Sequence, residues 1–552
     1  ELTANPDWYA VQALPVVGNP TEEDALSWAT AYYANSLAAA IVKANPRIKQ
    51  VFDTWMAQGG SKETLLSNLE RNQDLKNLLF EETPWISEAT EESEQKRRIA
   101  LLFDLNSMDN RLRTSIERLQ ELQLSDGSWS WYRGMTGSRY ITTQIVEMLA
   151  RLQHMNVTLD GKVVPMYTRA LGYLQKAVKE DYETMKKLEK EGATTLVPNN
   201  QVVHYLYVCA LEKQAASLAD KQVNAYMTDR LENRSAEYSI VEKAMIGLIM
   251  QAGGRQRQAQ ELVQSIKEYT VSTPQMGVYF DTPKAPYSWN NYRIPAQVAA
   301  MEAIQQIAPD ADMLAGMKLW LLKQKQVQVW ESSIATADAV YAFLNGSGNR
   351  LQVNGTMKAV AGNVEVRTPD DVLGYTRKTL TGTDTHVERV AVSKSGTGIG
   401  WGAVYAQYLE EMDKVLPAKG NGVSVAREWW MDGKQISRKT VLHAGDKMTV
   451  RLTVKADRDM DFIRVKDERA ACMEPDTQLS GYRWSNGLGC YQVNRDASTE
   501  FFIDRMPKGT YTLEYTVYLD RSGIYQAGAA TIQSVYAPEF SGHTGGQTLT
   551  VE

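Results

Sequence analysis

Cysteine and histidine are scarce in this sequence of 552 residues, which contains three cysteines and five histidines. The histidines are scattered along the chain, and neither an H-E-x-x-H nor a C-x-x-C pattern occurs. A zinc site needs several imidazole or thiolate ligands close together. The sequence therefore predicts no metal site, no zinc enzyme and no bound cofactor. The G-x-S-x-G elbow of many hydrolases is absent as well, so nucleophilic hydrolysis has no support.

Long apolar runs and an excess of one charge sign are also lacking. No apolar run approaches the roughly twenty residues that span a bilayer, and 43% hydrophobic with 23% charged residues is typical of globular domains. The net charge is only −6, with Lys and Arg interspersed among Asp and Glu, which argues against a nucleic-acid partner. At this length we expect about two to four domains, each with its own core.

Two of the three cysteines lie near each other in a region rich in strand patterns. Cys472 and Cys490 are 18 residues apart. In an oxidising compartment they could form a disulfide, which would stabilise the fold by roughly 3 kcal/mol. They could equally be two unpaired core residues, and the sequence does not decide between these alternatives.

The spacing of apolar residues is helical from about residue 22 to residue 345. After Ser107, for example, Leu112, Ile116, Leu119 and Leu122 repeat at intervals of three and four residues, which predicts an amphipathic helix. Turn signals separate such segments roughly every 15 to 25 residues, which is typical of antiparallel helical hairpins.

A weak internal repeat accompanies these helices. A loop that carries tryptophan precedes a segment rich in small residues at three places, which begin at Trp129, Trp289 and Trp330. Such recurrence predicts hairpins wound into a ring, an α/α toroid, with aromatic loops at one rim. A plain helical bundle is the alternative.

The period changes after Asn345. Residues 448–454 and 511–519 alternate between apolar and polar, which predicts half-buried antiparallel strands. Shorter alternating pieces at 351–353, 364–366 and 387–392 indicate an earlier β segment, and residues 416–422 form a linker pattern. The expected fold class is multidomain α plus β, with an α/α toroid followed by antiparallel β-sandwich domains.

Helical toroids also carry glycosidases, which place two carboxylates and stacking aromatic residues on rim loops. Asp126 near Trp129, Asp281 near Tyr279, and Glu331 next to Trp330 are candidates for such carboxylates. The alternative is that these acids cap helices and turns while the aromatic rings plug the helix ends.

Six short stretches stand out as an ordered set, at residues 5–15, 32–35, 81–85, 94–98, 126–131 and 536–540. Together they resemble bacterial α2-macroglobulins, particularly those of Bacteroides-like organisms, and the resemblance covers essentially the whole chain. It implies a thioester-type toroid domain over 1–348, the second half of a CUB-like β domain over 349–415, and a terminal macroglobulin-like, receptor-binding-type sandwich over 416–552.

In that family, members that bind proteases covalently carry Cys-x-Glu-Gln between two landmarks, Leu-Pro and Tyr-Ala-Asn. The landmarks align without a gap, which puts Asp24 at the Cys position, Ala25 next, Leu26 at the Glu position and Ser27 at the Gln position. A thioester requires a thiolate and a carboxamide acyl donor, and this sequence has neither there. The resemblance therefore implies a non-covalent member.

The resemblance also implies what the chain does and where. It predicts a non-enzymatic protease inhibitor that binds proteases through the full-length protein, with the bait segment upstream, or alternatively a cell-envelope scaffold or binding module. The implied location is the periplasm or the outer membrane, with envelope proteins as further partners. Residues 1–10 contain no signal-peptide pattern, so we expect that a leader was removed or that the chain is part of a longer protein.

A last expectation joins the two ends of the chain. In thioester-bearing relatives an aromatic residue of the terminal sandwich covers the reactive bond, and Tyr536 matches its place. We expect Tyr536 to lie near residues 22–30, with Trp28 as a neighbour. The alternative is an ordinary surface tyrosine.

Overall fold

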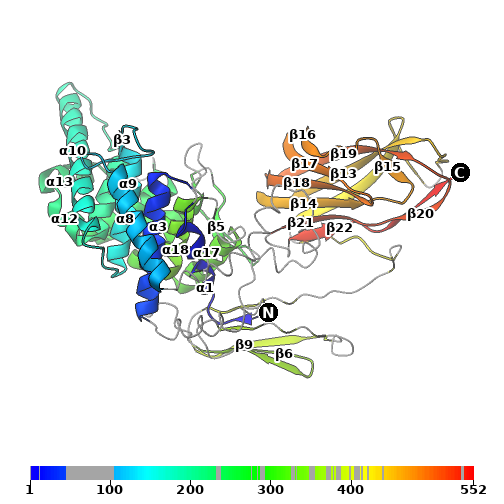
Figure 1. Cartoon of the computed structure of the whole chain (residues 1–552), viewed down its shortest axis with the longest axis horizontal. Coiled ribbons are helices and arrows are strands. Elements are labelled where there is room, and N and C mark those ends of the chain that lie inside the picture. The colour runs from blue at the N-terminus through cyan, green and yellow to red at the C-terminus, as the bar shows by residue number, and fades with distance from the viewer. Residues whose placement is uncertain are drawn as a thin grey trace. The chain divides into compact units, whose positions relative to one another are not determined.

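Figure 1 shows the computed structural model of the chain. It describes residues 2–552 except 12, 21, 45–104, 232–237, 275, 283, 286–292, 325–329, 331, 347–354, 369–373, 377, 379, 381–386, 397–398, 403, 405–410, 412–413, 419, 421, 438–439, 486 and 536–539. The described residues form two compact units, one ending at residue 404 and one starting at residue 411.

The first unit is mainly helical, and its helices run from blue through green in Figure 1. Its described helices are α1 (Trp8–Val11), α2 (Leu14–Val17), α3 (Ala25–Ala44), α8 (Leu105–Leu122), α9 (Arg139–His154), α10 (Val163–Lys190), α11 (Asn200–Leu211), α12 (Lys213–Leu218), α13 (Lys221–Leu231), α14 (Ile240–Ala252), α15 (Gln256–Lys267), α16 (Arg293–Ile307), α17 (Ala311–Lys323) and α18 (Ser333–Leu344).

Six of the described helices form a closed inner ring. Helix α3 packs against α9, α9 against α11, α11 against α14, α14 against α16, α16 against α18, and α18 against α3 again. The helices between them, such as α8, α10, α15 and α17, cover this ring from outside. The inner helices are buried on most sides, whereas an outer helix such as α15 buries one stripe of residues. The predicted α/α toroid is confirmed.

Polar caps define where several of these helices start. Ser239 and Glu242 form a reciprocal capping box at α14, and Asn199 and Asp310 accept a backbone N–H at the starts of α11 and α17. Each cap satisfies backbone donors that the first turn of a helix leaves unpaired. The boundaries of the ring helices are therefore set by local sequence.

The tryptophan repeat has the same hydrogen bonds at two of its three places. The indole N–H of Trp129 donates to the carbonyl of Leu119 at 2.8 Å, and its backbone N–H donates to the hydroxyl of Thr142 at 2.9 Å. The indole N–H of Trp330 donates to the carbonyl of Leu321 at 2.7 Å, and its backbone N–H donates to a threonine hydroxyl in α18 at 3.1 Å. Each tryptophan thus joins the end of an outer helix to the start of the next inner helix. Trp289, the third member, lies outside the described residues.

The first unit also contains short strands. A hairpin of β2 (Trp129–Ser130) and β3 (Gly137–Ser138) and a second hairpin of β4 (Thr270–Thr273) and β5 (Gly277–Phe280) connect helices. The unit also includes two three-stranded sheets, with the orders β10-β1-β8 and β7-β6-β9. Their strands are β1 (Leu2–Thr3), β6 (Met357–Ala361), β7 (Val364–Arg367), β8 (Tyr375–Thr376), β9 (Val390–Lys394) and β10 (Trp401–Gly402). The strand expected at 351–353 lies outside the described residues.

Strand β1 corrects one predicted boundary. The helical domain was expected to start at residue 1, but Leu2 pairs with Thr376 and Gly402 in the β segment. Leu2 also belongs to the small apolar core of that segment, together with Met357 and Ala359. A strand of two residues has no measurable period, so its partners far along the chain could not be predicted from the sequence.

The second unit is a β-sandwich of two main antiparallel sheets, coloured from yellow to red in Figure 1. One sheet has the order β12-β11-β13-β19-β15, the other β16-β17-β18-β14-β21-β22, and β20 pairs with β23. The strands are β11 (Val423–Met431), β12 (Lys434–Gln435), β13 (Lys447–Ala456), β14 (Met460–Glu468), β15 (Met473–Pro475), β16 (Gly481–Ser485), β17 (Leu488–Asn494), β18 (Ser498–Met506), β19 (Gly509–Leu519), β20 (Gly523–Ala527), β21 (Ala530–Ser534), β22 (Ser541–His543) and β23 (Gln547–Val551).

The two strands with the clearest alternation in the sequence lie side by side in this sandwich. Met448 pairs with Val517, and Val450 pairs with Tyr515, in the register of β13 and β19. The apolar residues of both strands are buried along one face. The predicted half-buried strands are confirmed.

Candidate functional site: the start of helix α3 and the centre of the helical ring

Asp24 caps helix α3 at the position that the family resemblance assigns to the thioester cysteine. Its Oδ1 accepts the backbone N–H groups of Leu26 at 2.9 Å and Ser27 at 3.1 Å. The hydroxyl of Ser27 donates to the other carboxylate oxygen of Asp24. Asp24 is buried. The side chains at positions 24 and 27 therefore bind each other and the first turn of α3, as an N-cap does.

Aromatic residues surround this helix start. The backbone N–H of Ala25 donates to the carbonyl of Trp131 at 2.9 Å, which ties α3 to the loop between β2 and β3. The rings of Trp131 and Tyr132 are stacked with their centroids 6.3 Å apart, and both are nearly half exposed. Trp28 is half-buried, and its indole N–H donates to Glu23 at 3.2 Å. Tyr536 lies outside the described residues, so its expected contact with residues 22–30 stays a prediction.

All three cysteines are free thiols. Cys472 and Cys490 are buried, and burial raises the pKa of each thiol to about 11. Of the two alternatives that the sequence left open, the structure thus has unpaired core residues rather than a disulfide. A buried thiol with a raised pKa is also a poor nucleophile.

A cluster of ionisable side chains occupies the inner ring, and sequence analysis missed it. We call it the ring cluster; its members are Glu147, Arg151, His204, Tyr207, Glu302, Asp338 and Tyr341. They come from four inner helices, α9, α11, α16 and α18. Six of the seven are buried, and His204 is 15% exposed in its side chain. The signal in the sequence is weak, because polar residues three or four apart on a helix are usually read as its solvated face.

Arg151 is at the centre of the ring cluster. One guanidinium nitrogen lies 2.7 Å from Glu147 Oε1, another contacts Asp338 Oδ1, and the guanidinium stacks over the ring of Tyr341 at 4.4 Å. The second oxygen of Glu147 contacts His204 Nε2 at 2.6 Å. One cation thus links two carboxylates on helices far apart in the sequence.

Glu302 accepts hydrogen bonds from two phenols. Tyr207 donates to its Oε2 and Tyr341 donates to its Oε1, both at 2.6 Å. Burial raises the pKa of both tyrosines far above their usual range, and the Glu302 carboxylate adds to this. Both phenols therefore stay protonated and remain donors.

The two carboxylates that contact Arg151 differ in pKa. Burial opposes the charged form of Glu147, but Arg151 and His204 outweigh it and hold its pKa at about 2. Burial raises the pKa of Asp338 to about 6, because Arg151 offsets it only in part and Glu147 repels the second charge. The ring cluster therefore holds Glu147 ionised, whereas Asp338 takes up a proton just below neutral pH.

The ring cluster and the candidate acid Asp126 are both engaged in internal hydrogen bonds or ion pairs. In the ring cluster each carboxylate is bound by a cation or by phenols, so it is engaged in the packing of the helices. On the rim, Asp126 accepts the backbone N–H of Ser128 at 3.0 Å and its hydroxyl at 2.6 Å, and these bonds lower the pKa of Asp126. Asp126 therefore caps a turn. Glu331 lies outside the described residues.

The described residues contain no group of three or more His, Cys, Asp or Glu side chains arranged to hold a metal ion. They also contain no helix long and apolar enough to cross a membrane.

Comparison with known proteins gives matches to a family model and to curated sequences. Residues 422–539 match the family described as the bacterial α2-macroglobulin MG10 domain. The chain is also 22% identical over 477 residues to the α2-macroglobulin homolog of Nostoc sp., an alignment that covers 79% of this chain and 23% of that protein. The chain is thus similar to bacterial α2-macroglobulins over most of its length. It spans only about a quarter of the length of that curated relative.

Two solved structures of bacterial α2-macroglobulins are similar to this one at low identity. The Salmonella protein reacted with methylamine has 13% identity and a TM-score of 0.37, and the match covers 100% of this chain and 31% of that chain. Native Escherichia coli α2-macroglobulin from domain MG7 to the C-terminus has 14% identity and a TM-score of 0.35, and the match covers 100% of this chain and 76% of that chain.

No cysteine of this chain starts a Cys-x-Glu-Gln sequence. Cys209 is followed by Ala-Leu-Glu, Cys472 by Met-Glu-Pro, and Cys490 by Tyr-Gln-Val. None of them belongs to the helix start where the family resemblance puts the thioester.

Proposed function

We propose that this chain is the C-terminal part of a bacterial protease trap, an α2-macroglobulin that inhibits endopeptidases without a covalent bond. The toroid over residues 4–348 takes the place of the thioester domain. Residues 349–415, with strand β1, form the later half of a CUB-like domain, and residues 416–552 form the terminal macroglobulin-like sandwich.

The observation that carries the non-covalent mechanism is the pairing of Asp24 with Ser27. Acylation of a thiol by a carboxamide needs both groups at the first turn of α3. There, a carboxylate binds two backbone N–H groups and a hydroxyl instead. Inhibition would depend on enclosing the protease by a change of shape in the whole protein.

The chain should contain no internal thioester. Intact-mass measurement before and after treatment with methylamine should show no added mass, and titration of thiols should give the same value in both samples. A thioester-bearing α2-macroglobulin treated in parallel is the positive control. Addition of one methylamine with release of one thiol would refute the claim.

The full-length protein should trap a protease when it is cut. After treatment with a general protease, it should migrate faster on a native gel, and the captured protease should cleave a small chromogenic peptide but not a large protein substrate. The same protease with its active site blocked beforehand is the matched control and should cause neither change. If the protein were cleaved but neither migrated faster nor kept the protease from the large substrate, the scaffold alternative would be favoured instead.

The proposed location follows from the family assignment. Proteases are the proposed partners of the full-length protein, and envelope proteins are proposed as its neighbours in the periplasm or at the outer membrane. Fractionation of cells that produce the full-length protein with its native leader would test this.

A further inference from the structure

Strand β16 (Gly481–Ser485) forms one edge of the six-stranded sheet of the sandwich. It pairs with β17 on one side, and among the described strands it has no partner on the other. Antiparallel pairing uses the backbone groups of alternate residues, so the backbone groups of the remaining residues face the open edge. Strand β16 therefore offers donors and acceptors to an additional strand.

The side chains of β16 alternate between two different surfaces. The hydroxyl of Ser485 donates to the carbonyl of Thr512 in the opposite sheet at 3.0 Å, which identifies the inward face. Arg483 is two residues away and lies on the same face. Tyr482 and Trp484 point outward and are 70% and 77% exposed.

Neighbours on β17 hold both outward rings in place. Tyr482 packs edge-on against Tyr491 with ring centroids 4.9 Å apart. The Trp484 ring lies over Gly489, where a Cβ atom would come within 3.0 Å of it. The exposed sides of these rings thus form an ordered apolar surface along the open edge, and exposed apolar surface of this kind is typical of interaction sites.

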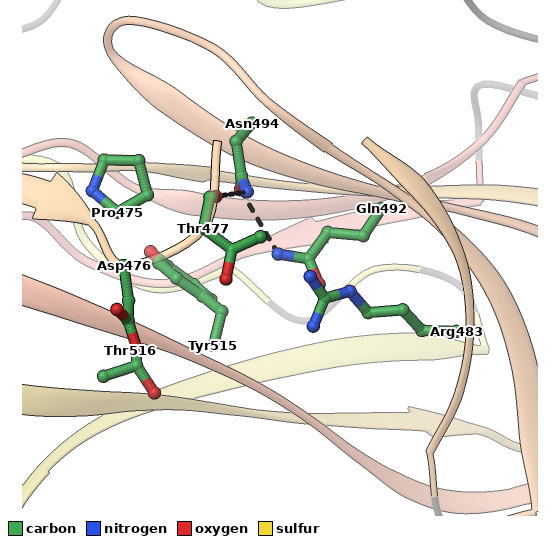
Figure 2. Close-up of a pocket in the computed structure, with 8 residues that line it drawn as sticks. All are labelled: Pro475, Asp476, Thr477, Arg483, Gln492, Asn494, Tyr515 and Thr516. Atoms are coloured by element: carbon green, nitrogen blue, oxygen red, sulfur yellow. Dashed lines mark hydrogen bonds between the residues drawn. The ribbon is translucent and has the colours of Figure 1, made fainter. Parts of the chain in front are cut away.

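The inward face borders a polar pocket of about 170 Å³. Figure 2 shows the guanidinium of Arg483 and the amide of Gln492 both directed into it. Gln492 is 2% exposed, and its Oε1 has no hydrogen-bond partner among the described residues. Arg483 forms no ion pair within the described part of the chain, and the one carboxylate that lines the pocket, Asp476, is paired with Lys447 at 2.9 Å.

These groups specify the chemistry of a ligand. A guanidinium binds a carboxylate through two parallel hydrogen bonds. A buried amide oxygen without a partner favours a ligand that brings an N–H or O–H donor. The pocket volume corresponds to about six water molecules at roughly 30 Å³ each, which is enough for a short acidic side chain.

We propose that the edge of β16 binds an extended segment of a partner protein by strand addition. An acidic side chain of that segment enters the pocket and pairs with Arg483, and the apolar side chains on either side of it pack against Tyr482 and Trp484. An inward-pointing charge on an edge strand disfavours pairing with a purely apolar strand, because the charge would be left without a partner. An acidic residue in the added strand pairs with Arg483 and makes the pairing favourable. This site lies in the sandwich and does not depend on the proposed protease trap.

The direct test uses the whole chain and a capped, fluorescein-labelled peptide, Ser-Thr-Val-Asp-Val-Thr-Ser, in which the Asp and Thr side chains would face inward. The control peptide has Asn in place of Asp. In fluorescence anisotropy the Asp peptide should bind at least about tenfold more tightly, because it alone forms the charged pair. Non-specific charge attraction cannot produce this preference, since the chain carries a net charge of −6.

Variants of Arg483 assign the binding to this pocket. Arg483→Gln should weaken binding of the Asp peptide at least about tenfold. Arg483→Glu should reverse the preference toward a peptide with Lys at the central position. Arg521→Gln is the matched control, because Arg521 is an exposed arginine of the same sandwich, and it should leave the affinity unchanged.

Hydrogen exchange places the bound peptide on the chain. Binding should protect backbone amides of residues 481–485. Equal binding of the Asp and Asn peptides, protection elsewhere, or no binding at the highest soluble concentration would overturn the proposal. Arg483 would then serve only to keep other strands away from the edge.

Discussion

Replacement of Asp467 by alanine is expected to lower the free energy of unfolding of the β-sandwich by about 3 to 5 kcal/mol. The side chains of Asp467 and Arg427 are each 1% exposed, and Arg427 Nη1 lies 2.6 Å from Asp467 Oδ1. Tyr515 donates its hydroxyl to the other carboxylate oxygen at 2.7 Å. Without the carboxylate, the guanidinium would be buried with no counter-charge.

Two further variants distinguish a buried charge from a lost contact. Glu514→Ala removes an ion pair with Arg451 whose side chains are 42% and 35% exposed, so it should cost at most about 1 kcal/mol. The triple variant Arg427→Met, Asp467→Leu, Tyr515→Phe removes the buried ion pair and the phenol together, so it should be clearly less destabilising than Asp467→Ala. Its remaining cost is the loss of Arg427 as a donor to Gln547 Oε1 and to the carbonyl of Glu468. A triple variant as unstable as Asp467→Ala would contradict this explanation.

The measurement must isolate the sandwich, because a chain with two units need not unfold in one transition. Hydrogen exchange of the central strands β13 and β14 under native conditions reports the opening of this unit alone. In Asp467→Ala the slowest amides of both strands should exchange faster, and amides of the inner ring should not change.

The two carboxylates that contact Arg151 should respond differently to replacement by an amide. At neutral pH, Glu147→Gln should destabilise the helical unit by about 3 to 5 kcal/mol, because it leaves Arg151 and His204 without their main counter-charge. Asp338→Asn should leave the stability unchanged or raise it, because burial raises the pKa of Asp338 to about 6 and the ionised side chain is therefore disfavoured by the fold at neutral pH.

The same pair predicts opposite dependences on pH. Asp338 binds its proton more tightly in the folded chain, so its contribution to stability is fully present below about pH 4 and is lost as pH rises through about 6. Glu147 has a lowered pKa, so its contribution is present above about pH 4.5 and is lost as pH falls toward 2.

Hydrogen exchange in the inner helices, measured from about pH 3 to 8, reports the free energy of unfolding of the helical unit at each pH. It would check the direction of both pH dependences. Asp338→Asn should remove the loss of stability that occurs as pH rises from about 4 to 6. Glu147→Gln should remove the loss of stability that occurs as pH falls below about 4.5. If the stability of the original chain and that of Asp338→Asn changed with pH in the same way, Asp338 would not titrate in this range.

The parts of the fold that could be predicted from the sequence are those with a clear local period. Ile116, Leu119 and Leu122 are buried in α8 as their spacing indicates, because an outer helix has one apolar stripe. Met448 and Val450 are buried in β13 for the equivalent reason. The tryptophan repeat indicated the ring because the indoles of Trp129 and Trp330 both donate to a carbonyl in the last turn of an outer helix.

The parts that could not be predicted depend on contacts between distant segments. Helix α16 is buried nearly all round, so its sequence has no distinct polar face. The ring cluster joins Arg151 to Asp338, and nothing in either helix alone distinguishes these residues from surface charges. At the start of α3, the alignment of landmarks selected Asp24 and Ser27, but the hydrogen bond between them is seen only in the folded structure.

The closure of the inner ring has a consequence for how the chain folds. Helices α3 and α18 are in contact although almost the whole helical unit separates them in sequence. During synthesis the first five of the described inner helices are made before α18. Until α18 is made, the apolar side of α3 lacks its cover and Arg151 lacks its ion pair with Asp338. Such exposed surface makes a partly made chain prone to aggregation. Truncation before α18 should therefore yield an insoluble product rather than a smaller ring.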